Sequence, residues 1–239
     1  MRDAVAFLTP LGGARAARRP TSAAVAWFPV VGTLVGGAVG AVWWGANEVW
    51  APGVAAAFAL VADLALTGLL HYDGLVDSAD GLLPPMDTER RLEVMADPTA
   101  GGFGVAVAVV VTLLRWAALA SGRPSVWLVA GIWCSSRTVM AVALRTLPYA
   151  RPSGLASSFR GTQRGGGVGI GAAGLAAGGG MAAMAGAAPG VAGVAAVGLA
   201  GAGVLWLSQR RLGGFTGDVL GAAGVIAETA GLLAAAARW

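Results

Sequence analysis

The sequence predicts an all-α, polytopic integral membrane protein built as a helical bundle. Its 239 residues are 56% hydrophobic and only 12% charged, and apolar runs recur from one end of the chain to the other. A helix that crosses the hydrocarbon core needs about 20 such residues. This composition excludes a disordered or nucleic-acid-coating protein despite the net charge of +4. A single cysteine, Cys134, excludes an intramolecular disulfide framework and a multi-cysteine zinc site.

Seven stretches are apolar enough to count as membrane spans. They are residues 24–46, 54–72, 102–121, 125–147, 167–188, 190–208 and 218–237. The fifth and sixth consist mainly of Gly and Ala, whose small side chains suit close helix–helix contact. The alternative there is a soluble linker, but residues 165–190 carry none of the Ser, Lys or Glu typical of one. We therefore expect about seven transmembrane helices in one domain that covers residues 1–239.

The arginines predict the orientation of the bundle. With a cytoplasmic N-terminus, 12 of the 16 arginines lie in cytoplasmic segments and two on the opposite side, while Arg115 and Arg137 lie inside helices. Such a bias is typical of proteins inserted with positive charge inside. We expect residues 1–23 to form a basic interfacial segment that lies on the membrane. The same orientation places the acidic segment 73–101 and the arginine-rich segment 145–164 together in the cytoplasm.

An acidic block follows the second apolar stretch. Asp73, Asp77 and Asp80 are spaced i, i+4 and i+7, so a helix would present them on one face. Three like charges repel one another unless a divalent cation binds between them. Mg²⁺ is the cation that best fits a few carboxylates, because it also binds the phosphates of a substrate. We expect these residues to bind Mg²⁺; the alternative is a solvated acidic helix end. His71, the only histidine, could act as a base, donate to a phosphate or serve as an interfacial anchor.

Further candidate residues follow in the same acidic segment. Asp97 supplies a fourth carboxylate, and Gly101 and Gly104 would let backbone amides approach a phosphate closely. Glycines before a membrane helix also occur for packing alone. We expect Asp97 to belong to the site.

Candidates also lie in the C-terminal half of the chain. Asp218 begins the last apolar stretch, where an aspartate could also be a helix cap. Arg145, Arg151 and Arg160 suit phosphate oxygens through their planar donors, although positive charge that controls topology explains them too. We expect Arg151 and Asp218 to contact the substrate.

Three charges lie deep in apolar stretches, where a charge needs a partner or a function. Asp63 precedes Asp73 by ten residues and Arg137 precedes Arg145 by eight, which gives depths of about 15 and about 12 Å. Matched depth and opposite sign lead to the hypothesis of a buried Asp63–Arg137 pair. Together with Glu228, these residues could instead form the polar pathway of a transporter.

Motifs along nearly the whole chain, in order, resemble those of the cobalamin synthase family, the adenosylcobinamide-GDP ribazoletransferases. The resemblance rests on Phe7-Leu8-Thr9, Phe28-Pro29-x-x-Gly32, His71-x-Asp73-Gly74-x-x-Asp77-x-x-Asp80-Gly81, Met95-x-Asp97-x-x-x-Gly101-x-x-Gly104, Ser136-Arg137, Tyr149-Ala150-Arg151-x-x-Gly154-Leu155, Phe159, Gly213-Gly214-x-Thr216-Gly217-Asp218-x-x-Gly221-Ala222 and Glu228.

The resemblance implies a Mg²⁺-dependent transferase of the cell (inner) membrane. The ribose hydroxyl of α-ribazole, or of its 5'-phosphate, would attack the diphosphate of adenosylcobinamide-GDP, giving adenosylcobalamin or its 5'-phosphate and GMP. Besides its substrates, the protein would contact the lipid bilayer and would bind no nucleic acid. The formation of a homo-oligomer is an open alternative.

The resemblance also assigns roles to residues. Asp73, Asp77 and Asp80 would hold the metal, with Asp77, Asp80 and Asp97 serving catalysis. The substrate-binding residues would be His71, Arg137, Arg151, Gly101, Gly104 and Asp218.

Two rival enzyme classes fit the residues less well. A CDP-alcohol phosphatidyltransferase needs Asp-Gly-x-x-Ala-Arg, but Asp73-Gly74 is followed here by Val76-Asp77. A membrane prenyltransferase needs a second Asp-rich block, which is missing.

Overall fold

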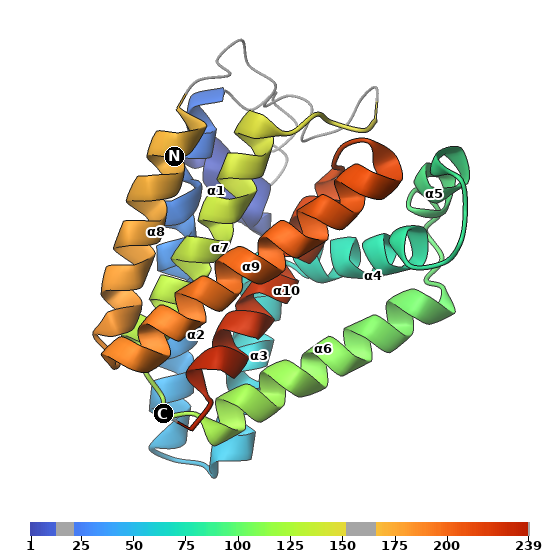
Figure 1. Cartoon of the computed structure of the whole chain (residues 1–239). Coiled ribbons are helices and arrows are strands. Elements are labelled where there is room, and N and C mark those ends of the chain that lie inside the picture. The colour runs from blue at the N-terminus through green and yellow to red at the C-terminus, as the bar shows by residue number, and fades with distance from the viewer. Residues whose placement is uncertain (13–21, 152–165, 239) are drawn as a thin grey trace.

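The computed structural model describes residues 1–12, 22–151 and 166–238, and this part of the chain is helical without a β-strand, as predicted. The elements in order are α1 (Arg2–Leu8), the 3-10 helix η2 (Ser22–Trp27), α2 (Phe28–Asn47), α3 (Pro52–Thr67), α4 (Leu70–Leu82), α5 (Thr88–Val94), α6 (Gly102–Ser121), α7 (Val126–Thr146), α8 (Gly167–Ala183), α9 (Ala187–Leu212) and α10 (Gly217–Ala235). Figure 1 shows that the longer helices form one bundle.

Each of the seven predicted spans overlaps at least one helix. Among the described residues, five segments are long and apolar enough to cross a membrane, namely residues 23–47, α6, α7, α9 and α10. The pair α3 and α4 qualifies only when joined, and α8 is a shorter apolar helix of 17 residues. The multi-pass character is therefore confirmed, whereas the number seven and the cytoplasmic N-terminus stay predictions.

The second predicted span, residues 54–72, is wrong at its C-terminal end. Helix α3 ends at Thr67, and Gly68 and Leu69 both take the left-handed conformation, with φ of 59° and 62°. Helix α4 then starts at Leu70 and runs at 90° to α3. The apolar run continues through this elbow, so hydropathy alone gave no sign of it. Because of the elbow, the acidic block lies on a separate crosswise helix (Figure 1).

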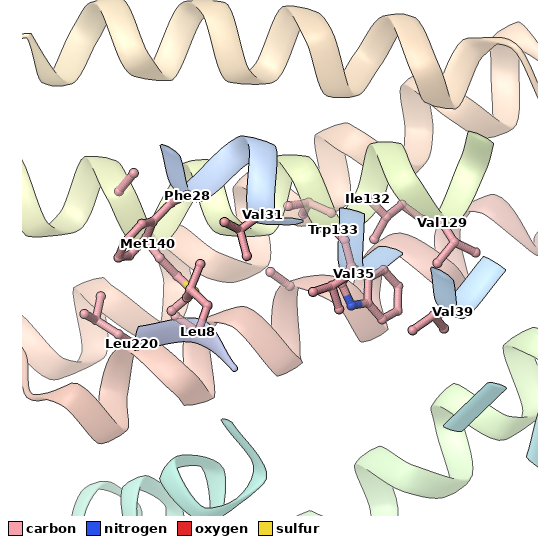
Figure 2. Close-up of a cluster of buried hydrophobic side chains, with 14 of the residues drawn as sticks. Leu8, Phe28, Val31, Val35, Val39, Val129, Ile132, Trp133, Met140 and Leu220 are labelled. Atoms are coloured by element: carbon pink, nitrogen blue, oxygen red, sulfur yellow. The ribbon is translucent and has the colours of Figure 1, made fainter. Parts of the chain in front are cut away.

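The centre of the bundle is the contact between α2 and α7. Figure 2 shows Val35 and Val39 of α2 beside Trp133 and Val129 of α7. A Cβ added at Gly36 would lie 2.5 Å from the Trp133 Cβ, so glycine allows the two helix axes to approach closely. This rigid pair fixes the position of the end of α7, which leads into the candidate site.

Glycines also set the packing of α8, as the small-residue pattern predicted. A Cβ at Gly178 would overlap the Ser135 side chain of α7, and one at Gly174 would overlap Thr138. Helix α8 therefore packs closely against α7 through its glycine face.

Helix α4 lies where several helix ends meet. It packs against α10 and α6 and contacts α5 and α9. In Figure 1 it extends sideways from the bundle toward α5, near the start of α6. The ends of helices far apart in sequence are thereby gathered around the acidic block.

Candidate functional site

Two glycines let α4 and α10 cross almost in backbone contact. A Cβ at Gly74 would lie 2.7 Å from the carbonyl oxygen of Asp218, and one at Gly221 would lie 3.2 Å from the His71 Cα. This approach brings Asp218, in the first turn of α10, close to the acidic residues of α4. Thr216 rather than Asp218 is the N-cap of α10, because its hydroxyl accepts from the Val219 amide at 3.2 Å. The Asp218 carboxylate is therefore not used as the cap.

A short backbone pairing brings Arg151 to the same place. Residues 148–150 pair with Phe215 in an isolated parallel bridge, with hydrogen bonds of 2.9 and 3.0 Å. The rings of Tyr149 and Phe215 meet edge to face with centroids 5.4 Å apart. As a result, Arg151 Nη2 lies 3.3 Å from Asp218 Oδ2, and both side chains are about a quarter exposed. The structure thus joins two motifs that the sequence separates by more than 60 residues.

The acidic cluster of Asp73, Asp77 and Asp218 carries more negative than positive charge. Asp73 is exposed and Asp77 is partly buried on the crosswise helix α4. Burial, together with the charges of Asp218 and Asp73, raises the pKa of Asp77 to about 6, and Arg151 offsets this only in part. Three carboxylates share one guanidinium, so the cluster favours an additional cation.

The donor set fits Mg²⁺ only together with other ligands. Among the described residues, no three His, Cys, Asp or Glu side chains are gathered as a metal site. The predicted site made of Asp73, Asp77 and Asp80 alone is therefore not formed. However, Mg²⁺ usually keeps several waters and takes one or two carboxylates plus substrate phosphates. Asp73 and Asp77, one helical turn apart, meet that requirement.

Asp80 binds backbone amides at the start of α6. It is 7% exposed, and its two oxygens accept hydrogen bonds from the amides of Gly101 at 2.7 Å and Gly104 at 2.9 Å. These amides belong to the start of α6, where backbone donors lack partners within the helix. Asp80 therefore caps α6 from a neighbouring helix, and its metal-binding and catalytic roles stay predictions. The Gly101 and Gly104 amides thus donate to Asp80 in this structure, and their contact with phosphate stays a prediction.

Gly104→Ala is expected to destabilise the protein and reduce its activity, because the new methyl group would lie 2.5 Å from Asp80 Oδ2 and 2.6 Å from Val76 Cγ1. The overlap should cost about 1–3 kcal/mol of folding free energy and separate α4 from α6. Thermal unfolding in detergent measures the loss. Gly102→Ala is the matched control, because nothing lies within 4 Å of its added Cβ. Equal melting temperatures of the two variants would contradict the assigned packing.

Asp97 lies in the exposed loop before α6. Its carboxylate accepts from the Thr99 amide at 2.9 Å and from the Thr99 hydroxyl. These bonds lower the pKa of Asp97, which works against a general base at neutral pH. In the structure, the Asp97 side chain stabilises a local turn, and its catalytic role stays a prediction.

The intramembrane charges form one buried network instead of the predicted Asp63–Arg137 pair. Arg115 Nη2 lies 2.8 Å from Asp63 Oδ2 and 3.3 Å from Glu228 Oε2. Arg137 pairs with the other oxygen of Glu228. The hypothesis was wrong because matched depth does not show which way a side chain points around its helix. Each of these charges has a partner of opposite sign within the network.

Arg137 and His71 are buried rather than open to substrate. Arg137 is 2% exposed and donates to Ser136 Oγ at 2.7 Å, which contradicts its predicted contact with the substrate. His71 is 4% exposed against α10, so it is not an interfacial anchor. Neither of its ring nitrogens has a hydrogen-bond partner among the described residues, and its substrate-binding role stays a prediction.

Two arginines that the sequence assigned only to topology hold the C-terminal end of α4. Arg91 Nη1 donates to the carbonyls of Gly81 at 2.7 Å and Leu82 at 3.0 Å. Arg211 donates to Leu82 and, at 3.2 Å, to Leu83. Cations beside a helix C-terminus satisfy its free carbonyls and its dipole. A basic residue nine positions after the end of an acidic helix was a signal that could have indicated this cap.

Three of the predicted site residues, Asp73, Asp77 and Asp218, thus gather with Arg151 at one place, and Arg160 lies outside the described residues. Comparison with known proteins identifies the family of the chain. The family model of cobalamin-5-phosphate synthase matches residues 1–236.

Curated relatives match the chain over most of its length. An adenosylcobinamide-GDP ribazoletransferase of Deinococcus radiodurans is 36% identical over 231 residues, which cover 94% of this chain and 81% of the relative. That of Bradyrhizobium diazoefficiens is 36% identical and covers 99% and 93%, and that of Chlorobaculum tepidum is 34% identical and covers 90% and 86%. No solved structure matches the chain. The chain therefore belongs to the cobalamin-5-phosphate synthase family.

Proposed function

We propose that this protein is an adenosylcobinamide-GDP ribazoletransferase that works at the cytoplasmic face of the cell membrane. It joins the cobinamide phosphate of adenosylcobinamide-GDP to a ribose hydroxyl of α-ribazole or α-ribazole 5'-phosphate. The new phosphorus–oxygen bond forms as the bond to GMP breaks. Family membership supports this activity, as do the names of the relatives. The observation that carries it in the structure is the meeting of Asp73, Asp77, Asp218 and Arg151 at the helix ends.

The residues of the cluster would have separate roles in a transfer reaction at a diphosphate. Such a reaction requires neutralised phosphate charge, an aligned hydroxyl and a stabilised leaving group. Asp73 and Asp77 would hold Mg²⁺, which when bound supplies charge neutralisation on the diphosphate. Arg151 donates to phosphate oxygens through its planar guanidinium. Asp218, beside Arg151, is the carboxylate left to orient the ribose hydroxyl and accept its proton.

The experiment uses the purified full chain in detergent with adenosylcobinamide-GDP, α-ribazole 5'-phosphate and Mg²⁺. We expect one GMP released for each cobamide phosphate formed. Chelation of Mg²⁺ should stop the reaction, and added Mg²⁺ should restore it. Omission of the ribazole substrate separates transfer from hydrolysis, because only transfer needs it. A folded protein that forms no joined product with both substrates present would overturn the proposal.

A further inference from the structure

The buried charges lie on the same helices that carry the candidate site. Asp63 belongs to α3, Arg115 to α6, Arg137 to α7 and Glu228 to α10. Each of these helices leads to one part of the site. Helix α3 continues through the elbow into the acidic helix α4, α6 begins at the cap made by Asp80, α7 ends shortly before Arg151, and α10 begins beside Asp218.

The network joins these helices with defined geometry. All four charged residues are 4% exposed or less, and the two arginines balance the two carboxylates. Trp133 of α7 donates to Asp63 Oδ1 at 3.0 Å, and Ser136 donates to Glu228 Oε1 at 2.8 Å. In a low-dielectric interior, charges that lose their partners are strongly penalised, so few other arrangements of the helices are allowed.

Arg115 links the network directly to α4, the helix that carries Asp73 and Asp77. Its guanidinium lies over the ring of Tyr72, 5.8 Å from the centroid, and over that of Trp133, at 5.2 Å. Tyr72 immediately precedes Asp73 on α4. On α10, Glu228 lies ten residues from Asp218, about 15 Å along a continuous helix. The network therefore controls both helices whose carboxylates meet in the site.

We propose that Asp63, Arg115, Arg137 and Glu228 are positioning residues for the transfer reaction, which set the place of Asp73 and Asp77 relative to Asp218. This inference rests on the proposed function. None of the four touches the reacting atoms. They act through α4 and α10, and a misplacement of about 1 Å is enough to reduce a rate by about a hundredfold.

The test removes one ion pair as a neutral unit, in the double variant Asp63→Asn/Arg115→Met. The asparagine keeps an acceptor for Trp133, and the Glu228–Arg137 pair stays balanced. We expect a melting temperature within about 5 °C of wild type, because removal of a whole pair spares the protein an unpaired charge. We expect kcat for GMP release to fall by about tenfold or more, with KM for adenosylcobinamide-GDP changed by less than about threefold.

The outcomes separate positioning from stability. The matched control is Val61→Ala/Leu113→Met, at exposed positions of the same two helices, and it should keep the wild-type kcat. A double variant that folds and turns over at the wild-type rate would overturn the inference. Absence of GMP release by the wild-type protein would instead overturn the proposed function.

A second variant decides the matter if the double variant does not fold. Arg137→Lys keeps the positive charge beside Glu228 but lacks the second donor group of the guanidinium. A severalfold loss of kcat at an unchanged melting temperature supports positioning. A wild-type kcat refutes it, because the detailed geometry of the network would then not matter.

Discussion

Asp77→Asn is expected to insert and fold like wild type but to release GMP about a thousandfold more slowly. Burial and the charges of Asp218 and Asp73 raise the pKa of Asp77. The amide has the same shape without the charge, so repulsion within the cluster falls and stability is retained. The affinity for a cation beside the diphosphate is lost, and preorganised charge is usually the largest single contribution to such catalysis. Steady-state GMP release and thermal unfolding in detergent measure the two effects.

The control for this variant is Glu89→Gln, a change at an exposed carboxylate of α5. It should leave both the rate and the melting temperature at wild-type values. Near-normal turnover of Asp77→Asn with an unchanged Mg²⁺ requirement would discard the assigned role of Asp77. If the variant loses both activity and folding, the role of Asp77 is structural rather than catalytic.

Glu228→Leu is expected to destabilise the protein by about 3–5 kcal/mol, the usual cost of breaking a buried ion pair by removing one partner. Glu228 serves both arginines of the network. Without it, Arg115 and Arg137 keep two positive charges and only Asp63 to balance them. The effect should appear as a lower yield of membrane-inserted protein and a strongly reduced melting temperature in detergent.

A second substitution tests the reason for this loss. Glu228→Leu combined with Arg137→Met removes the charge pair as a unit and should recover much of the lost stability. If the double variant is as unstable as the single one, packing rather than charge balance explains the effect. The two measurements need no enzymatic activity and therefore test the network independently of the proposed reaction.

The sequence predicted the helices better than their ends. Apolar length correctly located α2, α6 and α7, because hydropathy reports directly which segments can be buried in a bilayer. It failed between Thr67 and Leu70, where the chain turns by 90°. The turn depends on the left-handed conformations of Gly68 and Leu69, and a leucine in an apolar run carries no sign of such a conformation.

For a related reason, the sequence did not predict which of the buried charges form ion pairs. Sequence spacing gave a depth for Asp63 and for Arg137 but not the direction of either side chain. The structure pairs Asp63 with Arg115 and Arg137 with Glu228. The need for a partner was thus predicted correctly, while its identity required the rotation of each helix about its axis.

The candidate site was predicted in part. Asp73, Asp77, Arg151 and Asp218 were expected to act together, and the structure gathers them. Asp80 has the same spacing but instead receives the two glycine amides of α6. A glycine-rich turn offers its amides to any anion, and the sequence does not distinguish an external phosphate from a carboxylate of the same chain.

The elbow before α4 has a mechanical consequence. A non-glycine residue in the left-handed region costs about 1–2 kcal/mol relative to ordinary backbone, and Leu69 adopts it with φ of 62°. A glycine would relieve this cost but would also let the joint swing through many directions. Leucine restricts the joint, so α4 keeps one direction relative to α3, and its carboxylates stay where the other helix ends meet them.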